Sequence, residues 1–347
     1  MGLAGVRERL AADGLTPGVI DTIQGARALS TRTLYDSRWK AFHKWCLAQS
    51  PRLDSFQAPI GEVLRFLQDR VDAGLTFSTV KVWLASITAC HIGYDGVRVS
   101  EHPWVPPFMK GVKRLRARSK GLFPSWDLPV VLEGLCKPPF EPLESADLKF
   151  LTLKTVLLVA LTTTKRVSDI KALSVSQEYL RFSADGETVW LRPNSDFVAK
   201  NLLVPELPVE LKAFRPPDRA LHCLCPVRAL RLYLQKTSGS RASSQLFVSF
   251  APGKKHSAVA RSSLSRWIVE AIRLAYAGAG ATVPEGLRAH STRAVSTSWA
   301  ITRGVPIREV CMAANWSSPS TFVAFYNLDV SASTVAHTVL GVANSSH

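Results

Sequence analysis

The sequence predicts a mainly α-helical protein with two domains and a small antiparallel sheet in the second domain. Apolar residues recur at three- and four-residue spacing along most of the chain, which favours amphipathic helices. Asp185-Gly186 is a hairpin-turn signal, and it separates two short segments rich in aromatic and aliphatic residues, 179–182 and 188–192. The length of 347 residues is long for one domain and comfortable for two.

The first hundred residues have the pattern of a small four-helix bundle preceded by a short helix near residues 3–24. Serine, threonine, proline and glycine residues punctuate the pattern at the positions where helices usually begin and end. Three further helices are expected: one capped by Ser30-Thr31, one running from Pro59 to Gly74, and one over residues 79–91 capped by Ser78.

A strongly basic segment follows this bundle. Six cations fall within eleven residues: Lys110, Lys113, Arg114, Arg116, Arg118 and Lys120. The pattern predicts a short basic helix that runs into a linker. Its cations could form a solvated helix face, or they could lie on a phosphate backbone. We therefore expect an N-terminal helical domain over residues 1–108, a basic linker over 109–125 and a second domain over 126–347.

The second domain combines helices with the predicted hairpin. Residues 148–161 are strongly apolar and are expected to form a buried helix, and residues 197–204 could supply a third strand. Further helices are expected at residues 226–235, 263–277, 287–302, 306–314 and 320–326.

The charge of the chain indicates its class of partner. A net charge of +16 and a pI near 9.9 favour a polyanion, and nucleic acid is the commonest one; a basic but otherwise ordinary enzyme is the alternative. With 46% hydrophobic and 20% charged residues, the chain has ample material for packed cores. Neither a secretory signal nor a run of ~18 apolar residues occurs, so we expect an intracellular protein outside the membrane, with reduced cysteines and no metal.

Two fragments near the C-terminus carry the chemistry. His290-Ser-Thr-Arg293 places a histidine and an arginine at i and i+3, on one helix face. Tyr326 follows Trp316 closely enough for a short helix pair to return its phenol to that face. With Arg166, these residues could hold and attack a phosphodiester, because arginine matches phosphate oxygens bidentately and tyrosine forms a reversible phosphoester.

Each of these residues has a structural alternative when it is considered alone. Arg166 could be a helix cap, the His290 and Arg293 pair a surface or core feature, Trp316 a core residue and Tyr326 a half-buried aromatic bonded to the backbone. Their joint occurrence in one order favours the catalytic interpretation.

The chain resembles the tyrosine recombinases, the integrase family of DNA breaking and joining enzymes, over residues 25–335. In Leu161-Thr-Thr-Thr-Lys-Arg166-Val-Ser-Asp169-Ile170, an arginine opens a helix and an acid follows three residues later, as in that family. The resemblance implies a site made of Arg166, Lys200, His290, Arg293, Trp316 and the nucleophile Tyr326, with Asp169 supporting the active-site helices. The spacing from Trp316 to Tyr326 is one residue longer than in the commonest bacterial members.

Connecting segments are most similar to the recombinases of DIRS and Ngaro-type eukaryotic retrotransposons. These segments are Ser30-Thr-Arg-Thr-Leu-Tyr35, Cys225-Pro-Val-Arg-Ala-Leu230 and Trp316-Ser-Ser-Pro-Ser-Thr-Phe322. This closer resemblance implies a mobile-element enzyme that integrates DNA in the nucleus.

The family resemblance also implies a helical core-binding domain and an α+β catalytic domain that together clamp double-stranded DNA. It implies strand cleavage and rejoining through a 3′-phosphotyrosyl intermediate without a cofactor, in a homo-tetramer with a dimer on each site. Candidates for phosphate contact are Arg32, Arg38, Lys81 and the six cations of the basic segment. Two alternatives stay open: relaxation of supercoils by a type IB topoisomerase-like enzyme, and a domesticated DNA-binding protein without catalysis.

Overall fold

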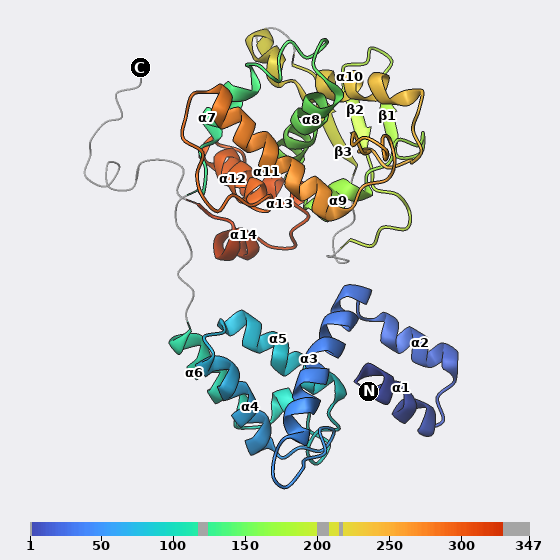
Figure 1. The fold of residues 1–347 in the computed structure, drawn as a ribbon, viewed down its shortest axis with the longest axis vertical. Helices are drawn as coiled ribbons and strands as arrows, with labels where there is room; N and C mark the ends of the chain where they lie inside the picture. The colour runs from blue at the N-terminus through green and yellow to red at the C-terminus, as the bar shows by residue number, and fades with distance from the viewer. Residues whose placement is uncertain (1, 117–123, 200–207, 215–217, 329–347) are drawn as a thin grey trace, which may run out of the picture. The chain divides into compact units, whose positions relative to one another are not determined.

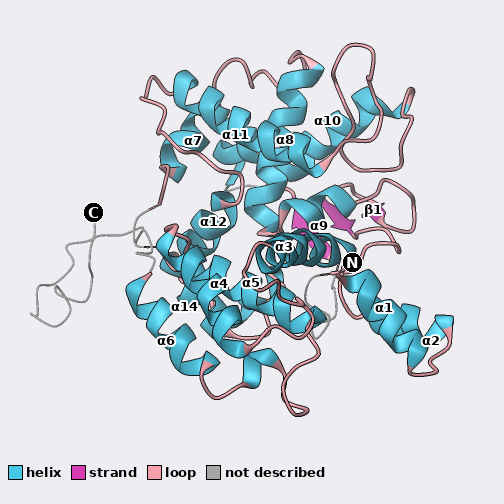
Figure 2. Ribbon diagram, turned by 60° about the horizontal axis from the view of Figure 1, so that its bottom comes forward, coloured by secondary structure: helices cyan, strands magenta, loops and turns pink. Residues whose placement is uncertain are grey.

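The computed structural model describes residues 2–116, 124–199, 208–214 and 218–328. The chain forms two compact units, residues 1–119 and 120–347, which are described separately here (Figure 1). Helices predominate in both units, and the sheet belongs to the second (Figure 2). This architecture confirms the predicted fold class. Within the described residues, no helix is long and apolar enough to cross a membrane.

The first unit is a helical bundle around an aromatic core. Its helices are α1 (Leu3–Ala12), α2 (Pro17–Gly25), α3 (Leu29–Leu47), α4 (Ile60–Asp72), α5 (Phe77–Cys90) and α6 (Val105–Leu115), with a 3-10 turn, η1 (Val99–Glu101). Trp39, Phe42 and Phe66 are fully buried between α3, α4 and α5, and the rings of Phe42 and Phe66 meet edge to face at 5.0 Å. This edge-to-face arrangement is the one that aromatic quadrupoles favour.

Several predicted boundaries in the first unit are wrong by a few residues. The segment near residues 3–24 is two helices rather than one, because Gly14 takes a positive φ of 84° and Pro17 starts the second helix. Ser30-Thr31 lies inside α3, which begins after Ala28, and α5 begins after Thr76 rather than after Ser78. The helix between Pro59 and Gly74 is confirmed. The front half of the basic segment lies within α6, which buries Val112 against the bundle.

The second unit is built around α8, a helix buried on every side from residue 151 to residue 161 (Figure 1). Its helices are α7 (Leu128–Leu135), α8 (Leu148–Thr163), α9 (Val167–Ala172), α10 (Pro226–Ser238), α11 (Arg261–Gly278), α12 (Ser291–Thr302), α13 (Ile307–Ala313) and α14 (Pro319–Phe325), with a 3-10 segment, η2 (Asp218–Leu224). The helices α10, α11 and α12 pack against α8. The prediction of a buried helix here is confirmed.

A three-stranded antiparallel sheet adjoins these helices, in the order β1 (Leu180–Phe182), β2 (Thr188–Leu191), β3 (Val209–Lys212). The predicted hairpin is confirmed, and Gly186 takes the positive φ of 69° that its turn requires. The predicted third strand at 197–204 is wrong where it can be seen: residues 197–199 are not a strand, and residues 200–204 lie outside the described residues. The true third strand pairs Leu211 with Val189, and burial of this pair fixes its register.

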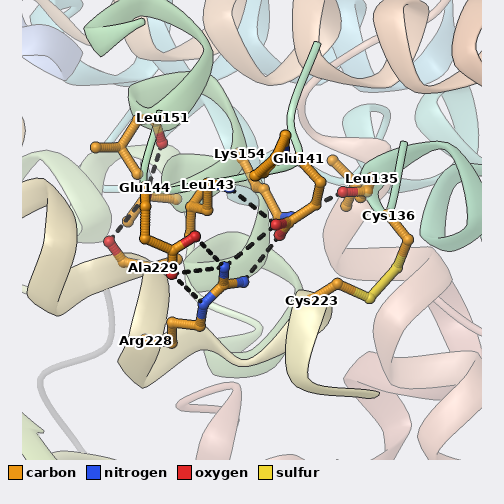
Figure 3. Close-up of polar contacts among 12 residues, drawn as sticks. Leu135, Cys136, Glu141, Leu143, Glu144, Leu151, Lys154, Cys223, Arg228 and Ala229 are labelled. Atoms are coloured by element: carbon orange, nitrogen blue, oxygen red, sulfur yellow. Dashed lines mark hydrogen bonds and ion pairs between the residues drawn. A yellow bond between two sulfur atoms is a disulfide. The ribbon is translucent and has the colours of Figure 1, made fainter. Parts of the chain in front are cut away.

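A buried ion network joins the α7–α8 connection to α10 (Figure 3). The Arg228 guanidinium donates to Glu141 at 2.9 Å and to Glu144 at 2.8 Å. Lys154, fully buried on α8, donates to Glu141 and to the Leu135 carbonyl oxygen, 2.7 Å away. Burial alone would raise the pKa of Glu141, but the hydrogen bonds from Arg228 and Lys154 hold this pKa below its usual value. The Glu141 carboxylate is therefore charged, and its oxygens accept hydrogen bonds from Arg228 and Lys154.

A disulfide joins Cys136, at the end of α7, to Cys223 in η2 (Figure 3). The expectation that all cysteines are reduced is therefore wrong for this pair, which is brought within bonding distance across 87 residues of sequence. The other four cysteines are free thiols and are buried. Burial raises the pKa of the Cys46 thiol to about 11 and that of the Cys90 thiol to about 12, which keeps both protonated.

The closest helix contact in this core depends on Gly134. A Cβ atom at this position of α7 would lie 1.8 Å from the Ala275 carbonyl oxygen of α11. We expect Gly134→Ala to lower the free energy of unfolding by about 1–3 kcal/mol, the usual cost of overpacking a core. Denaturant unfolding measures this loss. Gly239→Ala is the control, because Gly239 has a negative φ and open space around it; equal losses in both variants would contradict this account.

Candidate active site

Arg166 lies where α8 ends and α9 begins. Thr164 closes α8 in the left-handed conformation, with φ 51°, and Arg166 is the residue before the first turn of α9. Its backbone N–H donates to Asp169 Oδ2 at 3.1 Å, and Ser168 Oγ donates to the other carboxylate oxygen at 3.0 Å. The buried carboxylate of Asp169 thus fixes the backbone that carries Arg166.

Arg293 is the most deeply buried cation of the candidate site. It lies in the first turn of α12, and its side chain is only 1% exposed. One terminal nitrogen, Nη2, donates to the Ala314 carbonyl oxygen. Its Nε and Nη1 atoms are buried and have no acceptor among the described residues. A buried donor without an acceptor is costly, and such groups in a folded protein usually serve a ligand.

Two aromatic rings lie against the Arg293 guanidinium. Its central carbon is 4.8 Å from the centre of the Trp316 ring and 5.4 Å from the centre of the Tyr326 ring. The two rings are 4.7 Å apart, and the His290 ring meets Tyr326 edge to face at 5.8 Å. The structure therefore brings four of the predicted residues together, although they come from α12, the α13–α14 connection and the end of α14.

His290 differs from its predicted setting. The helix expected from residue 287 begins at Ser291, and His290 is the residue that precedes it. Its side chain is exposed, whereas Trp316 and Tyr326 are 5% and 9% exposed. The site thus has a buried wall formed by Arg293, Trp316 and Tyr326, and an accessible imidazole beside the phenol ring.

The electrostatics of the site disfavour its own positive charge. The pKa of Arg293 is lowered to about 10, first by burial and then by the charge of Arg166, while Tyr326 and Asp169 act in the opposite direction. The repulsion also shows that Arg166 belongs to the same cluster of charge as Arg293. Carboxylates pair with buried cations elsewhere in this unit, as Glu141 does with Arg228. Arg293 has no carboxylate partner among the described residues. An anionic ligand would therefore offset the free-energy cost of burying its charge.

Ser298 is a site residue that the sequence analysis missed. Its Oγ, on the buried side of α12, donates to the Tyr326 carbonyl oxygen and accepts from the Leu328 N–H, both at 2.9 Å. One hydroxyl therefore holds the backbone on both sides of the phenol. The available signal was the run Ser296-Thr-Ser298, which places hydroxyls where a buried helix would usually have apolar groups.

The other predicted residues are spread over the chain. Lys200, which lies between β2 and β3 in the sequence, is outside the described residues. Arg118 and Lys120, in the basic linker, are also outside them. In the first unit, Lys81, Lys110, Lys113 and Arg114 are exposed, and Arg32 and Arg38 are half-buried. Arg116 uses its guanidinium within the fold, because it donates to the Val71 carbonyl oxygen at 2.6 Å and so satisfies the end of α4.

The chemistry open to this arrangement follows from its donors. Arg293 Nε and Nη1 and Trp316 Nε1 are three buried N–H groups without an acceptor among the described residues. Fixed donors of this kind stabilise a developing oxyanion, because they need no reorganisation during the reaction. The ring of Tyr326 lies against the same guanidinium, and its phenol is a group that can act as a nucleophile.

No protein-family profile matches the sequence, and no curated protein is similar to it in sequence. Solved structures are similar in fold. The XerH site-specific recombinase, in a post-cleavage complex with the palindromic difH substrate, superposes with a TM-score of 0.60 at 14% identity, over 91% of this chain and 80% of that one. The Tn1549 transposon integrase, in complex with transposon right end DNA, gives 0.58 at 10% identity over 98% of both chains.

A lambda integrase dimer bound to a COC′ core site is also similar, with a TM-score of 0.52 at 14% identity over 94% of both chains. At these identities the likeness concerns the fold. The chain has the tyrosine recombinase fold, with a mainly helical architecture and a small three-stranded antiparallel sheet. The similar structures do not distinguish the DIRS and Ngaro types from other recombinases.

Proposed function

We propose that this protein is a site-specific DNA recombinase, or integrase, that cleaves and rejoins DNA strands through a 3′-phosphotyrosyl intermediate. One observation carries the proposal: the phenol of Tyr326 lies against a buried guanidinium that has two donor atoms left over. A structural arginine of this depth would be paired, as Arg228 is. The tyrosine recombinase fold and the net charge of +16 support the same conclusion.

The proposed reaction balances without any added reactant. The Tyr326 oxygen attacks phosphorus, the bond from phosphorus to the 5′ oxygen breaks, and the 3′ side of the strand becomes linked to the phenol. Arg166 and Arg293 clamp the non-bridging oxygens, and the Trp316 N–H is a third donor group. Rejoining is the reverse attack by a 5′ hydroxyl. The phosphoester bond energy is conserved throughout.

Two protons move during cleavage. The phenol loses one, and the exposed imidazole of His290 beside the Tyr326 ring is the group that we assign to accept or orient it. The departing 5′ oxygen gains one, and the family resemblance assigns that donation to Lys200. The action on a mobile element in the nucleus and the tetramer on double-stranded DNA are parts of the same proposal. The transposon integrase among the similar structures supports the mobile-element role, and the DNA-bound dimer supports assembly of several copies on DNA.

Covalent trapping tests the proposal. The full chain is incubated with nicked duplexes that carry candidate element termini, so that a cleaved strand loses the fragment needed for rejoining. We expect a protein–DNA adduct that survives denaturation, with the DNA mapped to Tyr326 by peptide mass. Binding without any adduct would favour the domesticated DNA-binding protein. Relaxation of supercoiled DNA without site preference would favour a topoisomerase-like enzyme.

Ser298→Ala should separate nucleophile placement from DNA binding. Without the hydroxyl, the backbone around Tyr326 loses two hydrogen bonds, which lowers the free energy of unfolding by about 1–2 kcal/mol. We expect adduct formation to slow by about tenfold, because a small displacement of a reacting group is enough for such losses, with duplex affinity unchanged. Ser298→Thr should restore most of the rate.

Thr237→Ala is the control for Ser298→Ala, because it removes a fully buried hydroxyl that bonds only within α10. It should lower stability without changing the rate of adduct formation relative to binding. Wild-type adduct kinetics in Ser298→Ala would show that the hydroxyl serves stability alone.

A further inference from the structure

The first unit contains a second group of cations and aromatic rings without acceptors, far along the sequence from the candidate active site. Arg38 of α3 lies with its guanidinium carbon 4.3 Å from the centre of the Trp83 ring of α5. Arg70, at the end of α4, lies 5.8 Å from the same ring and 4.8 Å from the Phe66 ring. Three helices thus converge on one indole with two positive charges.

The polar atoms of this cluster are not used by the fold. Arg38 Nε, Arg70 Nε and Trp83 Nε1 are buried and have no acceptor among the described residues. Trp83 is 8% exposed, whereas both arginines are half-buried, so their terminal nitrogens are reachable from solvent. Burial lowers the pKa of Arg38, with no compensating carboxylate. The fold therefore holds two guanidinium groups in place by cation–π contact and leaves their donors free.

A neighbouring pair in the same unit, Arg65 and Trp45, has acceptors for its polar donor groups. Arg65, also on α4, lies over the Trp45 ring at 5.1 Å, but it is paired with Glu62 at 2.6 Å and bonded to Gln49. The Trp45 N–H donates to Asp69 at 2.9 Å. The two clusters have the same residue types, and only one has acidic partners. The cluster of Arg38, Arg70 and Trp83 therefore differs from the other by lacking an acceptor among the described residues.

We propose that Arg38, Arg70 and the N–H of Trp83 form a seat for one backbone phosphate of duplex DNA. We call these three residues the phosphate seat. Two forks of donors and an indole N–H suit an oxyanion with several acceptor oxygens, and the stacked rings hold the forks rigid before binding. The proposal rests on the proposed function for the identity of the polyanion, and it adds Arg70 and Trp83 to the residues that we expect to contact DNA.

The salt dependence of duplex binding tests the phosphate seat. Each neutralised phosphate contributes about one unit to the slope of log affinity against log salt concentration. We expect Arg38→Gln and Arg70→Gln in the full chain each to weaken binding about tenfold and to reduce that slope by about one. Trp83→Phe keeps an aromatic ring and removes the N–H, so it should weaken binding severalfold without changing the slope. The double arginine variant should lose less than the sum of the single losses, because both serve one phosphate.

Arg65→Gln is the control, because it removes an arginine of the same helix with the same kind of aromatic contact but a paired guanidinium. It should leave affinity and slope nearly unchanged. Equal effects of Arg38→Gln and Arg65→Gln would contradict the phosphate seat. Poly-glutamate that competes for the seat as well as duplex DNA does would also contradict it, and would indicate an acidic protein partner. Thermal unfolding shows that the variants are folded. Adduct formation is measured separately from duplex binding. If the phosphate seat contributes to binding but no adduct ever forms, the proposed function is contradicted and the phosphate seat is not.

Discussion

Tyr326→Phe should abolish the covalent protein–DNA adduct and leave duplex binding intact. The substitution removes one oxygen and keeps the ring that packs on Trp316 and Arg293, at 4.7 and 5.4 Å. Since the hydroxyl that is removed is the proposed nucleophile, we expect adduct formation to fall by at least about 10³-fold, a rise in the barrier of about 4 kcal/mol. Trapping on a nicked duplex measures the rate, and a filter-binding or gel-shift titration measures affinity.

Tyr179→Phe is the control for this experiment. Tyr179 belongs to the same unit and is half-buried beside the sheet. Its variant should form adduct at the wild-type rate. An adduct that persists in the Tyr326→Phe protein would exclude this phenol as the nucleophile.

Arg293→Met should abolish cleavage and raise the free energy of unfolding. At neutral pH the folded chain carries the cost of a buried, unpaired guanidinium, whose pKa is lowered to about 10. A base with a lowered pKa in the folded state costs stability at every pH below that value, and the cost falls as pH rises through it. Methionine is apolar and of similar length. It loses the hydrogen bond to the Ala314 carbonyl oxygen, so we expect a net gain of about 1 kcal/mol.

Arg228→Met makes the opposite prediction and is the matched control. Arg228 is also largely buried, but its guanidinium bonds Glu141 and Glu144. Removing it leaves Glu141 with Lys154 as its remaining cation, so the free energy of unfolding should fall by about 1–3 kcal/mol. Denaturant unfolding compares the two variants. Added inorganic phosphate should stabilise the wild-type chain more than Arg293→Met, since the variant lacks the two unpaired donor atoms of Arg293. A loss of stability in Arg293→Met as large as that in Arg228→Met would contradict this account.

The sequence was sufficient for the parts of the fold that depend on short-range pattern. The continuous apolar run of α8 and the Asp185-Gly186 turn each have one favoured structure, and both are confirmed. Helix starts were predicted less well. Ser30 and Ser78 have the chemistry of caps, but α3 begins at Leu29 and α5 at Phe77, and helix ends commonly vary by one or two residues.

Three features could not be predicted from the sequence for a different reason. The third strand was placed too early, since Val209 and Leu211 are the residues whose alternation fits the sheet, and a short alternation carries little signal. Ser298 reads as an ordinary helical serine, and only the return of the chain at residues 326–328 gives its hydroxyl two partners. Pairing of Cys136 with Cys223 is likewise a product of tertiary structure.

The helix α12 carries both Arg293 and Ser298, so a single helix holds the proposed phosphate clamp and the residue that fixes the backbone of the proposed nucleophile. In an assembly of several copies, each phenol would then work with the arginine of its own chain. Inactive subunits of two kinds, one lacking the phenol and one lacking the guanidinium, should therefore fail to rescue one another when they are mixed. Restored cleavage in such a mixture would instead require the tyrosine to cross from one copy to the next.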